Sequence, residues 1–279
     1  MRMTFLAAAV AMAVLAPTVS DAQTRRHTPP SPPPSAELQP VSLPFGEFCT
    51  KYQRQGADSI LVGIDRTTRQ IRTVDRNGTA ATFADLRQVM RPGDRVIIFI
   101  VYEHATSRMM IFDDCVPGNS SVWTGRQHPA SVIEHDTATF MDNVAKAQQR
   151  VLEPFGTRQS ARSAIVTTLH GMVAQVNGPI KNLLLMSDLL DTEVMNLRPT
   201  ELVDTYRRQQ VIMKSLRQSH LIPSLGGTKI RIHGYGLSDD HVNNVYPPIT
   251  QDVMTSIKEV WKDFFRQTGA DLEPESFVN

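Results

Sequence analysis

Two aspartates stand directly after apolar runs that lie far apart in the chain. Asp65 follows the run at residues 59–64, and Asp188 follows the run at residues 183–187. Continuous apolar runs of this length are typical of strands that are buried on both faces of a parallel sheet. The carboxyl ends of such strands meet at one edge, where open α/β sheets bind ligands and ions. We therefore interpret the two carboxylates as a cation site or the remnant of one.

Catalytic chemistry has weaker support from the residue spacing. His233 and His241 flank a loop after the last predicted strand, and a His/Asp cluster there could bind zinc or transfer protons. No H-E-x-x-H pattern is present, so a solvated loop is the simpler interpretation. A serine hydrolase would use Ser187 or Ser238 as its nucleophile. Asp188 and His233 would complete that set, but the sequence lacks the G-x-S-x-G elbow of α/β hydrolases.

The order of the predicted elements, with Asp-x-Thr after the first strand and Ser-Asp after the fourth, resembles the von Willebrand factor A-type domain. This resemblance implies a metal-ion-dependent adhesion site, whose first loop reads Asp-x-Ser-x-Ser. Asp65 matches the first aspartate, and Thr67 matches the first hydroxyl. Asp188 matches the aspartate of the third loop. The second loop of the family supplies a threonine at a helix start, for which Ser163 is the match and Ser160 the alternative.

The resemblance also implies a cofactor and a mode of binding. Mg²⁺ prefers hard oxygen ligands in near-octahedral geometry, which carboxylates and hydroxyls supply. An open position lets a carboxylate of a partner protein complete the shell. Arg69 departs from this pattern, because it stands where the family has its second serine and a guanidinium does not bind a cation. The site is therefore expected to be weakened or lost, and we hypothesise that Arg69 pairs with Asp65 or Asp188 instead.

The elements that must position these residues alternate between strands and helices. The predicted fold is α/β, with a doubly wound, mostly parallel central sheet, helices on both faces and one antiparallel edge strand. Strands are expected at residues 59–64, 95–102, 108–112, 183–187 and 229–235. Helices are expected at residues 83–90, 136–153, 160–176, about 200–215 and about 250–267. The strand at 108–112 is the antiparallel one, because only a short turn separates it from the strand before.

Local signals set some of the expected boundaries. Thr82 is predicted to cap the helix at residues 83–90, after a short extended piece at 70–74 and a turn at Arg76-Asn77-Gly78. Further along the chain, Asn177-Gly178-Pro179 ends a helix before the next strand. These signals predict that the first helix is short.

The amino-terminal region predicts export. Residues 1–22 combine a charged start, a short apolar run and small residues at a cleavage point, as secretory signal peptides do. The apolar run is shorter than the roughly 20 residues that a membrane-spanning helix needs. Residues 23–44 are rich in proline and predict an extended spacer. Residues 45–279 are expected to form the A-type-like domain, in the periplasm or outside the cell and with no stable membrane span after cleavage.

The number of cysteines, the net charge and the hydrophobic fraction limit the kind of protein and the kind of partner. Cys49 and Cys115 are the two cysteines of the chain, and in an exported protein two cysteines most simply form one disulfide. The formal net charge of +1 provides no electrostatic case for nucleic acid as a partner. A hydrophobic fraction of 41% suits a globular protein.

These observations predict an exported protein that binds another protein, in adhesion or assembly at a bacterial cell envelope, with Mg²⁺ as the candidate cofactor. Binding is favoured over catalysis because nucleophile and cofactor motifs are absent from the sequence. Two alternatives remain open. One is a serine hydrolase of the α/β type, and the other is a structural paralogue whose metal site has decayed.

Overall fold

A six-stranded sheet forms the centre of the computed structural model. The sheet has the order β3-β2-β1-β4-β5-β6. β3 runs antiparallel to β2, and the other paired strands run parallel. The strands are β1 (Ser59–Asp65), β2 (Arg95–Val101), β3 (Met109–Cys115), β4 (Ile180–Met186), β5 (Lys229–His233) and β6 (Phe277–Val278). The predicted α/β class, the mostly parallel sheet and its antiparallel edge strand are confirmed.

The structure describes residues 46–52, 57–66, 73–102, 109–119, 128–153, 163–197, 205–235 and 250–278. The predicted signal peptide at residues 1–22 and the spacer at residues 23–44 lie outside these ranges. So do Thr67, Arg69 and Ser160 among the residues proposed for the site. Within the described ranges, no helix is both long and apolar enough to cross a membrane.

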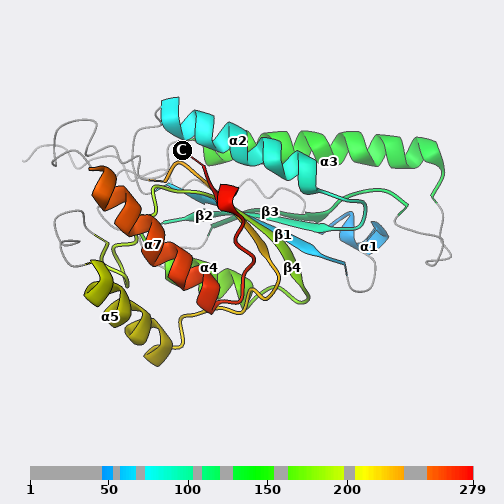
Figure 1. The fold of residues 1–279 in the computed structure, drawn as a ribbon. Coiled ribbons are helices and arrows are strands. Elements are labelled where there is room, and N and C mark those ends of the chain that lie inside the picture. Colours follow the sequence, from blue (N-terminus) through cyan, green and yellow to red (C-terminus); the bar gives the residue numbers. More distant parts are fainter. Residues whose placement is uncertain are drawn as a thin grey trace, which may run out of the picture. The chain divides into compact units, whose positions relative to one another are not determined.

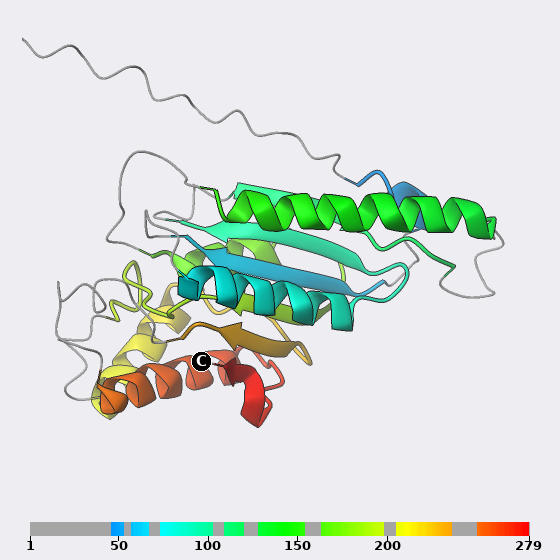
Figure 2. The same ribbon diagram turned by 90° about the horizontal axis from the view of Figure 1, so that it is seen from above.

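Helices cover both faces of the sheet. Figures 1 and 2 show α2 and α3 on one face, with α4, α5 and α7 on the other. The helices are α1 (Cys49–Tyr52), α2 (Thr73–Val89), α3 (Ala130–Val151), α4 (Ile165–Val173), α5 (Thr205–Gln218) and α7 (Gln251–Gln267), and η3 (Pro274–Ser276) is a short 3-10 helix.

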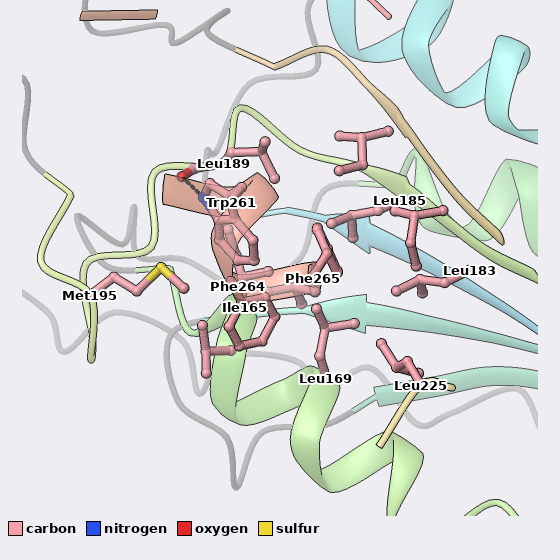
Figure 3. Packing of buried hydrophobic residues seen from close by; sticks show 14 of the residues in the cluster. Ile165, Leu169, Leu183, Leu185, Leu189, Met195, Leu225, Trp261, Phe264 and Phe265 are labelled. Atoms are coloured by element: carbon pink, nitrogen blue, oxygen red, sulfur yellow. Dashed lines mark hydrogen bonds between the residues drawn. The ribbon is translucent and has the colours of Figure 1, made fainter. Parts of the chain in front are cut away.

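The continuous apolar strands make this arrangement possible, because successive side chains point to opposite faces of the sheet. Leu61, Leu183 and Leu185 pack in the core beneath α4, α5 and α7. Their sequence neighbours Ile60 and Leu184 pack in the other core, beneath α2 and α3. A strand with apolar residues at every position therefore supplies two cores at once. Figure 3 shows the first of these cores, in which Phe264 and Phe265 of α7 lie among the leucines of β4.

The first long helix departs most from the sequence prediction. α2 begins at Thr73, so the predicted turn at Arg76-Asn77-Gly78 lies inside the helix. Thr82 is not its cap but an interior residue, whose hydroxyl donates to the carbonyl oxygen of Gly78 at 2.8 Å. A Cβ atom at Gly78 would lie 3.2 Å from Cγ of Met186, so the missing side chain lets α2 pass close to β4. Close packing thus offsets the poor helix propensity of glycine.

The other observed helix starts differ from the predicted ones by fewer residues. α3 begins at Ala130 rather than at residue 136, and the regular part of α4 begins at Ile165 rather than at residue 160. The last helix was predicted well, since the Thr250 hydroxyl accepts from the Val253 N–H at 3.3 Å and caps α7. β6 was missed because a strand of two residues has no periodicity to detect.

The predicted disulfide is present and ties α1 to the edge strand β3. Cys49 and Cys115 are bonded, with their Cα atoms 4.6 Å apart. Beside them, the buried Asp114 carboxylate accepts backbone N–H groups of Phe48, Cys49 and Cys115 through Oδ1, at 2.8, 3.1 and 2.8 Å. We call this junction of Phe48, Cys49, Asp114 and Cys115 the α1 anchor. It lies at the amino-terminal end of β2, because Cys115 pairs with Arg95.

Candidate functional site

Three polar side chains from separate segments meet at the carboxyl edge of the sheet. Asp65 is the last residue of β1, Ser187 follows β4, and Ser163 lies just before α4. The strand order reverses between β1 and β4, since β2 lies on one side of β1 and β4 on the other. Ligands of open α/β sheets bind outside the carboxyl ends of the strands at such a reversal.

The Asp65 carboxylate is the centre of this group. Its Oδ2 accepts a hydrogen bond from the Ser187 hydroxyl at 2.8 Å and another from the Ser163 hydroxyl at 3.0 Å. Both serines are buried, whereas Asp65 is half-buried. The structure therefore brings Asp65 and Ser163 together as the sequence suggested. It adds Ser187, which sequence reasoning had considered only as a nucleophile.

Asp188 lies beside this group but is engaged in a local turn. Its Oδ1 accepts the backbone N–H of Leu190 at 2.9 Å, which is the hydrogen bond of an Asx turn. The neighbouring Ser187 hydroxyl accepts the N–H of Leu189 at 2.9 Å while donating to Asp65. Asp188 thus shares a loop with a residue that contacts Asp65, and its role as a metal ligand stays a prediction.

The loop after β4 is attached to the start of α4 by a set of hydrogen bonds. We call residues Ser187–Leu197 the clamp loop. The Thr192 hydroxyl accepts the N–H of Ser163 at 2.8 Å, and the Thr192 N–H donates to the carbonyl oxygen of Ser163 at 3.0 Å. The N–H of Glu193 also donates to that oxygen, at 3.3 Å. Both backbone groups of Ser163 are therefore bonded to the clamp loop.

A buried aspartate completes this attachment. Asp191 is fully buried, and its Oδ2 accepts the N–H of Val166 in the first turn of α4 at 2.9 Å. Its Oδ1 accepts the N–H groups of Val194 and Met195, each at 3.0 Å. Burial raises the pKa of Asp191 above its ordinary value, while the three N–H donors act to lower that pKa. Asp191 thus serves as the cap that α4 lacks in its own sequence.

The far side of the clamp loop is fixed by α7. Leu189 has a positive φ of 64°, a conformation that non-glycine residues seldom adopt. Its carbonyl oxygen accepts a hydrogen bond at 2.8 Å from Nε1 of Trp261, which is fully buried in α7. Figure 3 shows this bond as a dashed line above the packed rings of Phe264 and Phe265. The packing of α7 therefore supports the strained turn next to Ser187 and Asp188.

A buried cation stands next to Asp65 in the sequence. Arg66 is buried, and its guanidinium donates to the carbonyl oxygen of Val151 at 2.7 Å, at the carboxyl terminus of α3. Burial lowers the pKa of Arg66, and the charges of Asp75 and Asp65 act in the opposite direction. Its positive charge acts on Asp65. The position of Arg66 directly after a buried strand could have suggested this interaction, because a buried charge needs a partner. The pairing proposed for Arg69 stays a prediction, because Arg69 lies outside the described residues.

His233 is the last residue of β5, and its carbonyl oxygen accepts the backbone N–H of Ser187 at 3.0 Å, while its side chain packs against α2. Its Nε2 lies 2.7 Å from Oδ2 of Asp85 on α2, and Arg231 donates to Oδ1 of the same carboxylate at 3.0 Å. Ser187 instead bonds to Asp65. Among the described residues, the side chains of Ser187 and His233 are therefore bonded to different aspartates, and the serine hydrolase stays an untested alternative. Ser238 and His241 lie outside the described residues.

The donor set at Asp65 is made of hard oxygen atoms. Each serine gives its single hydroxyl proton to Asp65, so the lone pairs of the Ser163 oxygen and the second lone pair of the Ser187 oxygen can face a cation. In the part of the chain that the structure describes, no cluster of three or more His, Cys, Asp or Glu side chains is suited to a metal ion. The side chains that meet at Asp65 offer hydroxyl and carboxylate oxygens, which are the ligand types that hard cations prefer.

Neither a scan against models of known protein families nor a search of curated proteins returned a match to this chain.

Proposed function

We propose that this chain is an exported binding protein, similar to von Willebrand factor A-type domains, that recognises a carboxylate of a partner protein at the Asp65 site. One observation carries the proposal: the hydroxyls of Ser163 and Ser187 converge on a single carboxylate oxygen of Asp65. Three segments that are distant in sequence thus offer oxygen ligands at one point. The position at the reversal of strand order supports a binding role.

Mg²⁺ is the cofactor that we propose for this oxygen set, and the positive charge of Arg66 next to Asp65 would weaken its binding. Asp65, Ser163 and Ser187 would hold the ion directly or through water, and Asp188 in the clamp loop would extend the set. Thr67, which the family resemblance also suggests, lies outside the described residues. When bound, the ion supplies a positive charge that attracts a partner's glutamate or aspartate. The protein keeps the two hydroxyls in place by hydrogen bonds to Asp65, so no rearrangement of these side chains is needed before binding.

Export is supported by the disulfide and by the amino-terminal sequence. The bond between Cys49 and Cys115 suits an oxidising compartment such as the periplasm or the extracellular space. A charged start followed by a short apolar run and small residues suits a signal peptide. The proposed location is therefore the periplasm or the cell exterior.

Calorimetric titration of the full-length protein with Mg²⁺ and Mn²⁺ tests the cofactor. We expect saturable binding that Asp65→Ala abolishes and that Ser163→Ala weakens about tenfold. Ser215→Ala is the matched control, because Ser215 lies on the exposed face of α5. Absence of binding by the unmodified protein would contradict a working ion site and favour a structural paralogue with a decayed site.

Partner recognition needs its own experiment. A photo-crosslinking amino acid at the exposed Glu193 of the clamp loop, in exporting cells, should yield a defined adduct with another protein. The adduct should weaken when Asp65→Ala is added, and it should persist with the control Ser215→Ala. Adducts that do not depend on Asp65 would show that partners bind elsewhere.

A further inference from the structure

We infer that Thr192 and Asp191 are positioning residues, which set the Ser163 hydroxyl against Asp65 without touching the bound ion or partner. This inference rests on the proposed function, since it says how the same site is kept in its binding geometry. Neither residue belongs to the motif that the family resemblance supplied.

Thr192 provides the first step of the argument. It bonds to Ser163 twice, accepting the Ser163 N–H through its hydroxyl at 2.8 Å and donating its own N–H to the Ser163 carbonyl at 3.0 Å. The two bonds fix the Ser163 backbone on both sides of its Cα atom. The direction of the short Ser163 side chain, which donates to Asp65 at 3.0 Å, follows from that backbone position.

Asp191 provides the second step, because it fixes the helix that follows Ser163. Its buried carboxylate links the N–H of Val166 in α4 to the N–H groups of Val194 and Met195 in the clamp loop. The start of α4 therefore cannot shift along the sheet without breaking bonds inside the core. Unpaired buried donors would make such a shift costly.

The third step is that one loop controls two of the three site residues. Ser187, the first residue of the clamp loop, donates to Asp65 directly, while Thr192 in the same loop holds Ser163. Outer groups that orient ligands commonly change metal affinity by about 10–100-fold when they are removed. The loop thus ties Ser163 and Ser187 to each other as well as to Asp65.

Thr192→Val and Thr192→Ser together test the inference in the full-length protein. Valine has the shape of threonine but cannot accept the Ser163 N–H, whereas serine keeps the hydroxyl. We expect Thr192→Val to weaken Mn²⁺ and Mg²⁺ binding about tenfold, and Thr192→Ser to bind within about twofold of the unmodified protein. Urea unfolding of each variant separates this effect from a general loss of stability.

A second measurement needs no metal. Amide hydrogen exchange should show faster exchange of the Ser163 N–H in Thr192→Val, but not in Thr192→Ser or in the control Ser215→Ala. If the unmodified protein binds no ion, the proposed function fails, and the exchange result alone decides the inference. Unchanged Ser163 exchange in Thr192→Val would overturn it, as would unchanged ion affinity in a protein that binds the ion.

Discussion

The α1 anchor and the clamp loop lie at opposite ends of the sheet and are stabilised by the same type of hydrogen bonding. In each, a buried aspartate accepts three backbone N–H groups from two segments: Asp114 at 2.8–3.1 Å and Asp191 at 2.9–3.0 Å. Burial raises the pKa of both carboxyl groups above the ordinary range, while the N–H donors act to lower it. Each aspartate thus replaces backbone partners that secondary structure does not supply.

The two junctions differ in what reinforces them. The α1 anchor also has the disulfide, and nearby Lys51 and Tyr52 bond to Asp136 of α3. Among the described residues, the clamp loop is joined to α4 by hydrogen bonds without a covalent link. Both carboxylate oxygens of Asp191 are bonded, whereas Oδ2 of Asp114 is buried without a hydrogen-bond partner in the described part of the chain. The end that carries the site is therefore held by hydrogen bonds, and the other end by hydrogen bonds and a crosslink.

Removal of the crosslink should produce the largest change in stability. The double substitution Cys49→Ser and Cys115→Ser opens a loop that spans 66 residues of sequence separation. We expect the free energy of unfolding to fall by about 4 kcal/mol, because the unfolded chain regains the freedom that the bond removed. Urea unfolding of oxidised and substituted proteins measures this loss.

Ion binding by the folded fraction provides the control for that experiment. It should be unchanged, since the crosslink lies at the amino-terminal end of β2 and the site at the carboxyl end of β1. A parallel loss of binding would show that the two ends of the sheet are coupled.

Removal of Asp191 should have the next largest effect. Asp191→Ala leaves three backbone N–H groups without their acceptor, two of them in fully buried hydrogen bonds. We expect a loss of about 3 kcal/mol in unfolding free energy, measured by urea titration. Asp142→Ala on the exposed face of α3 is the matched control and should change stability by less than about 0.5 kcal/mol.

Asp114→Ala should cost less than Asp191→Ala, at about 2 kcal/mol. The substitution relieves the burial of an oxygen that lacks a described partner, and the disulfide still ties α1 to β3. The two variants are compared by urea unfolding under oxidising conditions. An equal or larger loss of unfolding free energy in Asp114→Ala would contradict the view that the disulfide contributes most of the stability of the α1 anchor.

The smallest effect should appear in the pH dependence of stability. The hydrogen bond from Lys51, followed by that from Tyr52, lowers the pKa of Asp136. A lowered folded-state pKa contributes stability above the unfolded value of about 3.9, and this contribution is lost as the pH falls through the folded value. Thermal melts should therefore show Asp136→Asn less stable than the unmodified protein near neutral pH. The difference should shrink in acid, and a constant difference would assign it to packing instead.

The long apolar strands were predictable because each carries its own signal. β1, β2 and β4 are buried along nearly their whole length, so local hydrophobicity reports their structure directly. α2 was predicted ten residues too short at its start, because Gly78 and its neighbours favour a turn in isolation. Packing against Met186 on β4 reverses that preference, and a contact between residues so distant in sequence has no local signature.

Only some of the residues around Asp65 could be predicted, because only some of them have a local sequence signal. Asp65 could be assigned because it ends a recognisable strand, and Ser163 because the family resemblance suggested a hydroxyl at a helix start. The positions of Asp191 and Thr192 gave no comparable signal, since an aspartate followed by a threonine is common in loops and turns. Their role depends on hydrogen bonds to α4, which sequence spacing does not report.

The amino-acid sequence by itself determined the class of the fold, the edge of the sheet at which Asp65 stands and the pairing of the two cysteines. Strand burial, strand ends and cysteine number are properties of short segments or of composition, so they can be read before folding is known. Only the tertiary structure decided which hydroxyls reach Asp65, which carboxylates cap α1 and α4, and on which face His233 lies. Those outcomes depend on contacts between segments up to 148 residues apart. Such contacts form only when the chain folds, so no short segment of sequence reports them.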